Sequence, residues 1–226
     1  MSVEDLFADG FGKNKPVLPL DGAIPFEKYC PIDLSVENKK LENVALSNPE
    51  ACQRYIDAVL KRNNAQVAYG GYLEKRNLYA NSGRFSEGEV RDIHLGVDFW
   101  CEAGTKVVVP FGGMVHSFKN NADKGNYGPT IILEHHLPQG VVFYSLYGHL
   151  SVESLSGLFK GKPFAKGEVL AYLGTTDINV NYAPHLHFQL ILDLQGCQGD
   201  YPGVCSAEKI AFYQKNCPDP ALFFQL

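Results

Sequence analysis

The chain has 226 residues, of which 45% are hydrophobic, and its formal net charge is −5 at pH 7. This length suits one large domain or a domain with an extension, and the apolar content can build a sizeable core. The acidic balance argues against nucleic acid as a partner, and no run is long and apolar enough to predict a membrane-spanning helix.

Residues 1–81 differ in pattern from the rest and are interpreted as an N-terminal extension. Prolines punctuate its irregular start, and one helix is predicted over about 49–62. Asn48 can cap this helix, Pro49 suits its first position, and an apolar stripe at helical spacing follows.

The cellular compartment is inferred from the first ten residues, which are acidic and contain no continuous apolar stretch. They do not resemble a secretory signal peptide, so a cytoplasmic location is expected. The six cysteines are then expected to be free thiols, because disulfides persist mainly in oxidising compartments. A disulfide among Cys197, Cys205 and Cys217 is the alternative.

From Gly70 onward the chain alternates short β-type runs with glycine-containing turns. This pattern predicts a mainly β domain, an antiparallel small barrel or sandwich. The predicted strands are Tyr72–Tyr79, Thr105–Val109, Met114–Phe118, Thr130–Glu134, Val141–Tyr147, Val169–Leu173 and His185–Leu192. A short helix is expected around Ala207–Gln214.

Two strand-like segments place metal-ligand residue types on one face. His94 and Asp98 lie four residues apart, and His185 and His187 lie two apart. Alternate residues of a strand share a face, so each pair faces one way while apolar neighbours face the other. Imidazole and carboxylate groups are good zinc ligands, and the pattern therefore predicts a metal site. A third segment, Gly148-His149-Leu150, lies between them.

The ordered set of motifs resembles the lysostaphin-type, or LytM-like, zinc metallopeptidases. The resemblance spans roughly Tyr72 to Leu192. Its motifs are His94-x-x-x-Asp98, Gly104-Thr105, Gly112-Gly113, Tyr127-Gly128, Tyr147-Gly148-His149-Leu150-Ser151, Lys166-Gly167-Glu168, Leu173-Gly174 and Pro184-His185-Leu186-His187-Phe188.

The resemblance implies a zinc endopeptidase acting on peptides or peptidoglycan fragments, with a mostly antiparallel β fold and a groove over the site. It implies that Zn2+ is held by His94, Asp98 and His187, and that His149 and His185 are catalytic. His185 is interpreted as the base that activates water and His149 as the group serving the oxyanion or the leaving amine, although the sequence does not separate these roles.

The chain departs from the family pattern at two places near the expected groove. Tyr182-Ala183 stands where Thr-Gly is usual, and Gln189 stands where Glu is usual. The predicted organisation is an extension over 1–81, the metallopeptidase domain over 82–192, and a C-terminal extension over 193–226 packed on it.

Two other functions remain open at this point. One is an intracellular zinc hydrolase that acts on other small-residue peptides or on an amide of a small metabolite, and the other is a metal-free regulatory binding module. The sequence does not indicate an oligomeric state. Structural rather than catalytic roles are expected for His116, His135 and His136, while Tyr127, Tyr144, Tyr147 and Tyr182 are candidates for the groove or the core.

Overall fold

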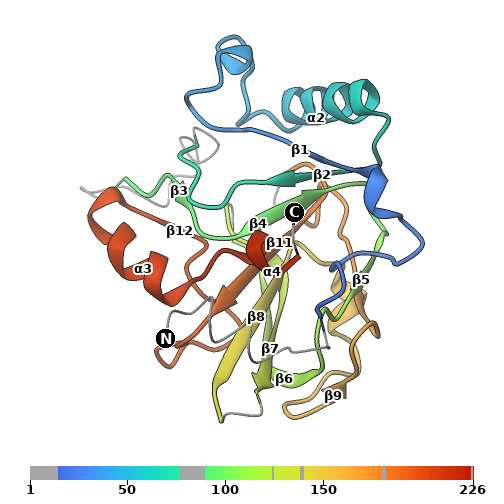
Figure 1. Cartoon of the computed structure of the whole chain (residues 1–226), viewed down its shortest axis with the longest axis vertical. Helices are drawn as coiled ribbons and strands as arrows, with labels where there is room; N and C mark the ends of the chain where they lie inside the picture. The colour runs from blue at the N-terminus through green and yellow to red at the C-terminus, as the bar shows by residue number, and fades with distance from the viewer. Residues whose placement is uncertain (1–14, 77–89, 124, 138–139, 180–181, 225) are drawn as a thin grey trace.

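The structure is a computed structural model that describes residues 15–76, 90–123, 125–137, 140–179, 182–224 and 226. Figure 1 shows a β-sheet flanked by short helices. The strands are β1 (Tyr29–Pro31), β2 (Val67–Gly70), β3 (Ile93–His94), β4 (Val97–Trp100), β5 (Lys106–Val108), β6 (Gly113–Asn121), β7 (Gly128–His136), β8 (Val142–Gly148), β9 (Pro163–Phe164), β10 (Val169–Tyr172), β11 (His185–Ile191) and β12 (Val204–Cys205). The helices are α2 (Pro49–Asn63), α3 (Ile210–Asn216) and α4 (Pro220–Phe224), with 3-10 turns η1 (Phe26–Lys28), η2 (Lys39–Leu41), η4 (Val152–Leu155) and η5 (Ala207–Lys209).

Eight strands form the main sheet in the order β1-β2-β4-β11-β8-β7-β6-β9. The pairing of β1 with β2 is parallel, and the other neighbours pair antiparallel. The prediction of a mainly β, antiparallel domain with a helix in the N-terminal extension is confirmed. Among the described residues, no helix combines the length and apolar character needed to cross a bilayer.

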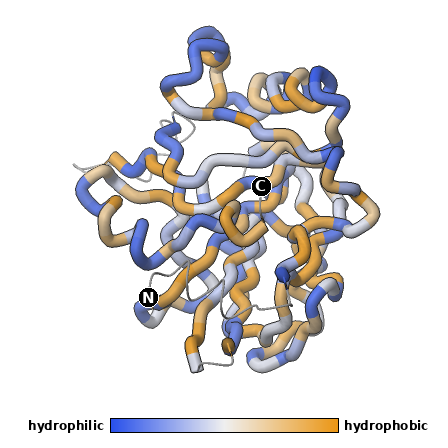
Figure 2. The backbone as a smooth tube through the Cα atoms, in the orientation of Figure 1, coloured by the Kyte–Doolittle hydropathy of each residue, from blue (hydrophilic) through white to orange (hydrophobic). Residues whose placement is uncertain are grey.

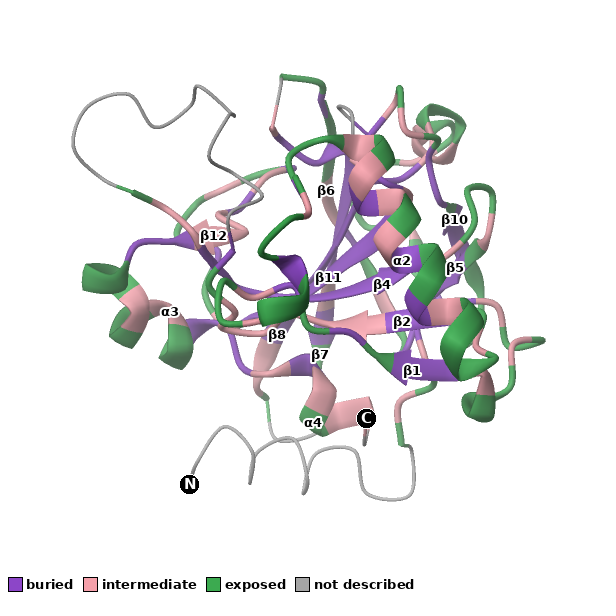
Figure 3. Cartoon of the chain, turned by 90° about the horizontal axis from the view of Figure 1, so that it is seen from above, coloured by how far each residue is buried: buried purple, intermediate pink, exposed green. Residues whose placement is uncertain are grey.

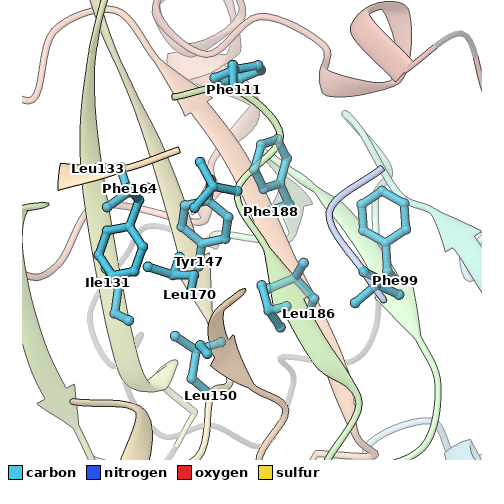
Figure 4. Packing of buried hydrophobic residues seen from close by; sticks show 14 of the residues in the cluster. Phe99, Phe111, Ile131, Leu133, Tyr147, Leu150, Phe164, Leu170, Leu186 and Phe188 are labelled. Carbon is cyan, nitrogen blue, oxygen red and sulfur yellow. The ribbon is translucent and has the colours of Figure 1, made fainter. Parts of the chain in front are cut away.

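One face of the central strands forms the main hydrophobic core. Val97 and Phe99 of β4 and Leu186 and Phe188 of β11 point into it. Figure 4 shows Phe99, Leu186 and Phe188 in the same cluster as Tyr147 of β8. Figure 2 shows hydrophobic stretches along the strands, and Figure 3 shows the same strands as largely buried. The alternation that the sequence predicts for β4 and β11 therefore places their apolar residues in one core.

The N-terminal segment covers the other face of β2 and β4. The side chain of Asn48 accepts a hydrogen bond of 3.0 Å from the backbone N–H of Ala51, which caps helix α2. The buried face of α2, including Ile56, forms a second hydrophobic cluster with Ala68 of β2 and Trp100 of β4. Burial of Trp100 in this cluster thus links the N-terminal segment to the central strands. Figure 1 shows helix α2 beside β1 and β2.

The C-terminal segment packs against strands β3 and β11. Strand β12 pairs antiparallel with β3, so that Val204 lies opposite His94. Helix α4 lies against β11, where Phe224 contacts the ring of Phe188 at a centroid distance of 5.3 Å. All six cysteines are free thiols. The segment therefore contacts the two strands that carry the histidine motifs.

Two expectations about strands were wrong in detail. Residues 72–76 of the predicted strand Tyr72–Tyr79 form a turn and an isolated bridge, and its last residues lie outside the described residues. The stretch from His94 to Asp98 is also not one strand. Strand β3 ends at His94, where it pairs with β12, and the backbone N–H of Leu95 donates to the carbonyl of Gly203 at 2.9 Å. The chain then joins the main sheet as strand β4 at Val97.

Candidate metal centre and catalytic histidines

The register of three neighbouring strands brings the histidine motifs together. Strand β11 lies between β4 and β8, and His187 is directly opposite Asp98 on one side and Gly148 on the other. His185 is opposite Trp100. Because directly opposed residues on neighbouring strands have side chains about 5 Å apart, the pairing alone places His187 against Asp98.

His94, Asp98 and His187 form a compact buried cluster whose ligand atoms all lie within 4.8 Å of one another. The His94 Nε2 atom is 2.9 Å from His187 Nδ1 and 3.2 Å from Asp98 Oδ1. His187 Nδ1 is 3.1 Å from the same carboxylate oxygen. Ligands of tetrahedral zinc, bonded at about 2.0–2.1 Å, lie roughly 3.3 Å apart, so the spacing of the donor atoms suits that ion.

The outer nitrogens of both imidazoles are held by acceptors. His94 Nδ1 lies 2.9 Å from the Gly71 carbonyl, which can only accept, so this nitrogen carries the proton. His187 Nε2 lies 3.0 Å from Gln189 Oε1. The amide nitrogen of Gln189 is used for the Pro202 carbonyl at 3.1 Å, so its oxygen faces His187 and accepts.

These bonds direct two lone pairs and a carboxylate oxygen at one point. With the outer N–H groups donated elsewhere, the inner nitrogens of neutral His94 and His187 face each other without a proton between them. Burial lowers the pKa of His94 to about 4, which keeps this ring neutral near pH 7. A cation satisfies such a set of donors, and histidine that donates its second N–H to a carbonyl is the usual arrangement of zinc ligands. The residues therefore fit a zinc ion.

Arg76 balances the charge of the cluster from behind. Its guanidinium Nη1 donates to Asp98 Oδ2 at 2.6 Å, and its Nε donates to Glu74. Glu74 also accepts from the backbone N–H of Leu34, at 2.9 Å, which joins the N-terminal segment to this network. Burial would raise the pKa of Asp98, but His94 and Arg76 outweigh it and hold this pKa well below its usual range. Asp98 is therefore a carboxylate with Oδ1 left for the cluster.

His185 lies beside the cluster with a defined orientation. Its Nδ1 donates to the Ala183 carbonyl at 2.7 Å, and its Nε2 lies 4.0 Å from Asp98 Oδ1. The ring stacks on Trp100 at a centroid distance of 3.9 Å. Burial lowers the pKa of His185 to about 4, so its Nε2 has a free lone pair at neutral pH.

His149 completes the set of histidines. Its ring centroid is 4.1 Å from that of His185, and its backbone has a φ of 64° in the left-handed region. The buried Nδ1 atom has no hydrogen-bond partner among the described residues. Burial and the neighbouring His185 hold the pKa of His149 well below its usual value. A buried imidazole nitrogen without a partner is unusual and marks a position where a substrate group can bind.

Gly96 makes room for the cluster. A Cβ atom at this position would lie 2.6 Å from the Phe188 carbonyl oxygen and 2.8 and 2.9 Å from two atoms of the His187 ring. Such contacts are shorter than van der Waals packing allows. The glycine between His94 and Asp98 therefore lets His187 approach both residues.

The structure separates the other candidate residues into two groups. The ring centroid of Tyr127 lies 5.0 Å from that of His187, and that of Tyr182 lies 5.8 Å from that of His149, so both tyrosines border the site. The others have polar partners or packing elsewhere: His116, His135, His136, Tyr144 and Tyr147.

Sequence reasoning missed several residues that surround the ligands. Arg76, Gly71 and Trp100 carried no recognisable motif, because their partners are distant in sequence or are backbone carbonyls. Gln189, which the sequence predicted to lie near the groove, is fully buried and its Oε1 lies 3.0 Å from His187 Nε2. The alternation along β11 was the available signal, since it places residue 189 on the face of His187.

The chain is similar in sequence to known peptidases. A sequence model described as Peptidase family M23 matches residues 92–198, which include all five candidate residues. An uncharacterized metalloprotease of Haemophilus influenzae is 31% identical over 132 residues, which is 55% of this chain and 25% of that protein. The chain thus matches about a quarter of the length of that relative.

Two solved structures are among the matches to this chain. The catalytic domain of the antimicrobial peptidase lysostaphin from Staphylococcus simulans is 23% identical, and the alignment covers 67% of this chain and 94% of that domain with a TM-score of 0.40. A putative peptidase M23 from Pseudomonas aeruginosa is 22% identical, with 58% and 43% of the two chains covered and a TM-score of 0.38.

Proposed function

Residues 92–198 belong to peptidase family M23, and from this premise we propose that the protein is a zinc-dependent endopeptidase. Its proposed substrates are peptidoglycan cross-links or related peptides of small residues. The observation that carries the proposal is the buried cluster in which His94 Nε2, His187 Nδ1 and Asp98 Oδ1 converge. Three protein ligands are the number found in catalytic zinc sites, which keep one position open.

His94, Asp98 and His187 hold the ion in this proposal. A zinc ion, when bound, lowers the pKa of water to about 7 and polarises a carbonyl oxygen. The protein supplies one carboxylate and two neutral imidazoles, and Arg76 offsets the charge of Asp98 on its far oxygen. In the described part of the chain the metal-ligand cluster consists of His94, Asp98 and His187, and His149 and His185 are the proposed groups that transfer protons.

His185 is the proposed general base. The bond from its Nδ1 to Ala183 leaves Nε2 as the proton acceptor, and that atom points to the cluster. Stacking on Trp100 fixes the plane of the ring. A base that is neutral at working pH and held beside the attacking water meets the geometric requirement for general base catalysis.

His149 is the proposed partner for the carbonyl oxygen or the leaving amine. Its ring lies next to that of His185, and its Nδ1 has no hydrogen-bond partner within the parts of the chain that the structure describes. A donor placed where negative charge develops can supply a factor of about 10²–10³ in rate. The two histidines thus divide proton acceptance and charge stabilisation.

Tyr182 and Ala183 border this machinery where the family pattern has Thr-Gly. The Tyr182 ring centroid lies 6.3 Å from that of His185, and Ala183 provides the carbonyl that orients His185. The Tyr182 ring borders the site and restricts which substrate side chains fit beside the catalytic histidines. Peptides with glycine or alanine at the cleaved bond are the proposed class.

The test is digestion of purified peptidoglycan and of short glycine- and alanine-rich peptides, with products identified by mass spectrometry. We expect zinc-loaded protein to release peptide fragments, and His94→Ala and chelator-treated protein to be inactive. His136→Ala is the matched control, because this half-exposed histidine pairs with Glu134 away from the site. Cleavage of short peptides without cleavage of peptidoglycan would favour a substrate other than peptidoglycan. No cleavage of either would contradict the proposal.

A further inference from the structure

Gln189 connects a proposed metal ligand to the C-terminal segment, residues 193–226. Its side chain is completely buried. The Oε1 atom lies 3.0 Å from His187 Nε2, while Nε2 of the amide donates to the Pro202 carbonyl at 3.1 Å and to Cys217 Sγ at 3.3 Å. Both of the latter partners belong to the C-terminal segment.

The amide can take only one orientation in these surroundings. The Pro202 carbonyl accepts and never donates, so the NH2 group must face it and the oxygen must face His187. The oxygen in turn requires a donor, so His187 carries its proton on Nε2. The Nδ1 lone pair is then directed at His94 and Asp98. The hydroxyl of Tyr127, at 3.5 Å from the same Nε2, is a longer contact.

The C-terminal segment is fixed where it holds this amide. The Leu95 backbone N–H donates to Gly203, next to Pro202, at 2.9 Å. The Tyr72 hydroxyl donates to the Cys217 carbonyl at 2.7 Å. Leu95 directly follows His94, and Tyr72 directly follows Gly71, the hydrogen-bond partner of His94. The C-terminal segment therefore binds on the side of the site where the first proposed ligand lies.

A carboxylate at residue 189 could accept from His187 but could not donate to Pro202. The family pattern has Glu at this position, and this chain has Gln beside a carbonyl that needs a donor. We propose that Gln189 is a positioning residue, oriented by the C-terminal segment, that holds His187 as the Nε2–H tautomer and so prepares Nδ1 for the metal. The inference rests on the proposed function for the identity of the metal site.

The test compares Gln189→Met with wild type in the full chain. Methionine has a similar length but cannot accept from His187. Zinc affinity is measured by competition with a chromophoric chelator, and the His187 tautomer by nitrogen-15 NMR of the metal-free protein. We expect zinc to bind 10- to 100-fold more weakly, the usual effect of losing a partner of a metal-bound histidine. The ring should also lose its Nε2–H preference. Gln214→Met, at an exposed position of α3, is the matched control and should leave both unchanged.

A second variant separates orientation from general damage. Gln189→Glu still accepts from His187, so zinc affinity and the Nε2–H tautomer should stay close to wild type. Loss of the bond to Pro202 should lower the midpoint of thermal unfolding. If Gln189→Met fails to fold, Gln189→Glu and Cys217→Ala provide the same two measurements, and the tautomer should persist in both.

Wild-type zinc affinity together with an unchanged Nε2–H tautomer in Gln189→Met would overturn the proposal. So would a Gln189→Glu protein that is folded but has lost the tautomer. Failure of the proposed function is distinguishable: a wild-type protein that binds zinc but cleaves no peptide contradicts the peptidase activity alone. If wild type binds no zinc, the metal site fails, and the tautomer in the metal-free protein still decides whether Gln189 orients His187.

Discussion

Gly96→Ala is a small change with a large expected effect on the metal site. The new Cβ would lie 2.6 Å from the Phe188 carbonyl oxygen and 2.8 Å from Cε1 of His187. Neither atom is at the end of a flexible side chain: one belongs to the backbone of β11 and the other to a ring held by Gln189. The strain must therefore move strand β11 or rotate the imidazole.

Overpacking of a filled interior costs about 1–3 kcal/mol. We expect the metal-free Gly96→Ala protein to lose this much unfolding free energy. Zinc binding should weaken about 10- to 100-fold, because the zinc-bound state needs His187 in its original place. A strain of this size is expressed in the Kd for zinc, where each 1.4 kcal/mol corresponds to about a tenfold change.

Urea denaturation of the metal-free protein and chelator competition for zinc measure the two effects. Gly22→Ala is the matched control, since a Cβ there meets no atom within 4 Å. A Gly96→Ala protein with both the stability and the zinc affinity of wild type would refute the packing argument.

Three further predictions concern stability. Arg76→Met should destabilise the metal-free protein by about 3–5 kcal/mol in urea denaturation, because it leaves Asp98 buried without its cation. The control Lys75→Met removes an exposed ion pair with Asp92 and should cost about 1 kcal/mol or less, so equal losses in the two variants would contradict this. Burial lowers the pKa of His135 from 6.5 to about 4, so the unfolded state binds more protons, and the contribution of neutral His135 to stability, about 3 kcal/mol, should be lost as the pH drops from above 6.5 toward 4. His94 and His185 add losses of the same sign, so an unfolding free energy that stays flat over this range would oppose the prediction. His149→Gly should be about 1 kcal/mol more stable than His149→Ala, since both remove the imidazole but only glycine relieves the positive φ; the reverse order in thermal unfolding would argue against backbone strain.

The sequence predicted the elements whose signals are local. Helix α2 follows from its Asn48 cap and apolar stripe, and the alternation of β4 and β11 follows from period-two burial. The break at Leu95 could not be foreseen, because it depends on a hydrogen bond to Gly203, more than a hundred residues away. Residues 72–76 have strand-type composition but form a turn and an isolated bridge, and Leu73 in the turn has a φ of 54°.

The candidate site shows the same difference between residues with local sequence signals and residues whose contacts are distant in sequence. His94, Asp98 and His187 were chosen from spacing and family resemblance, and the structure brings them together. Arg76 and Trp100 were not chosen, because an ion pair and a ring stack form only when β4, β11 and the N-terminal segment assemble. The role of Gln189 likewise depends on Pro202, which reaches it only through the path of the C-terminal segment.

Zinc content measured beside peptide hydrolysis, for single alanine variants of the five histidine and aspartate residues, tests the central claim most directly. The account predicts about one zinc per chain in wild type, and loss of both zinc and activity in His94→Ala, Asp98→Ala and His187→Ala. His149→Ala and His185→Ala should retain zinc but lose a factor of about a hundred or more in rate. Loss of zinc in His185→Ala with retention in His187→Ala would contradict this assignment, as would a wild-type protein that stays free of zinc after the metal is supplied.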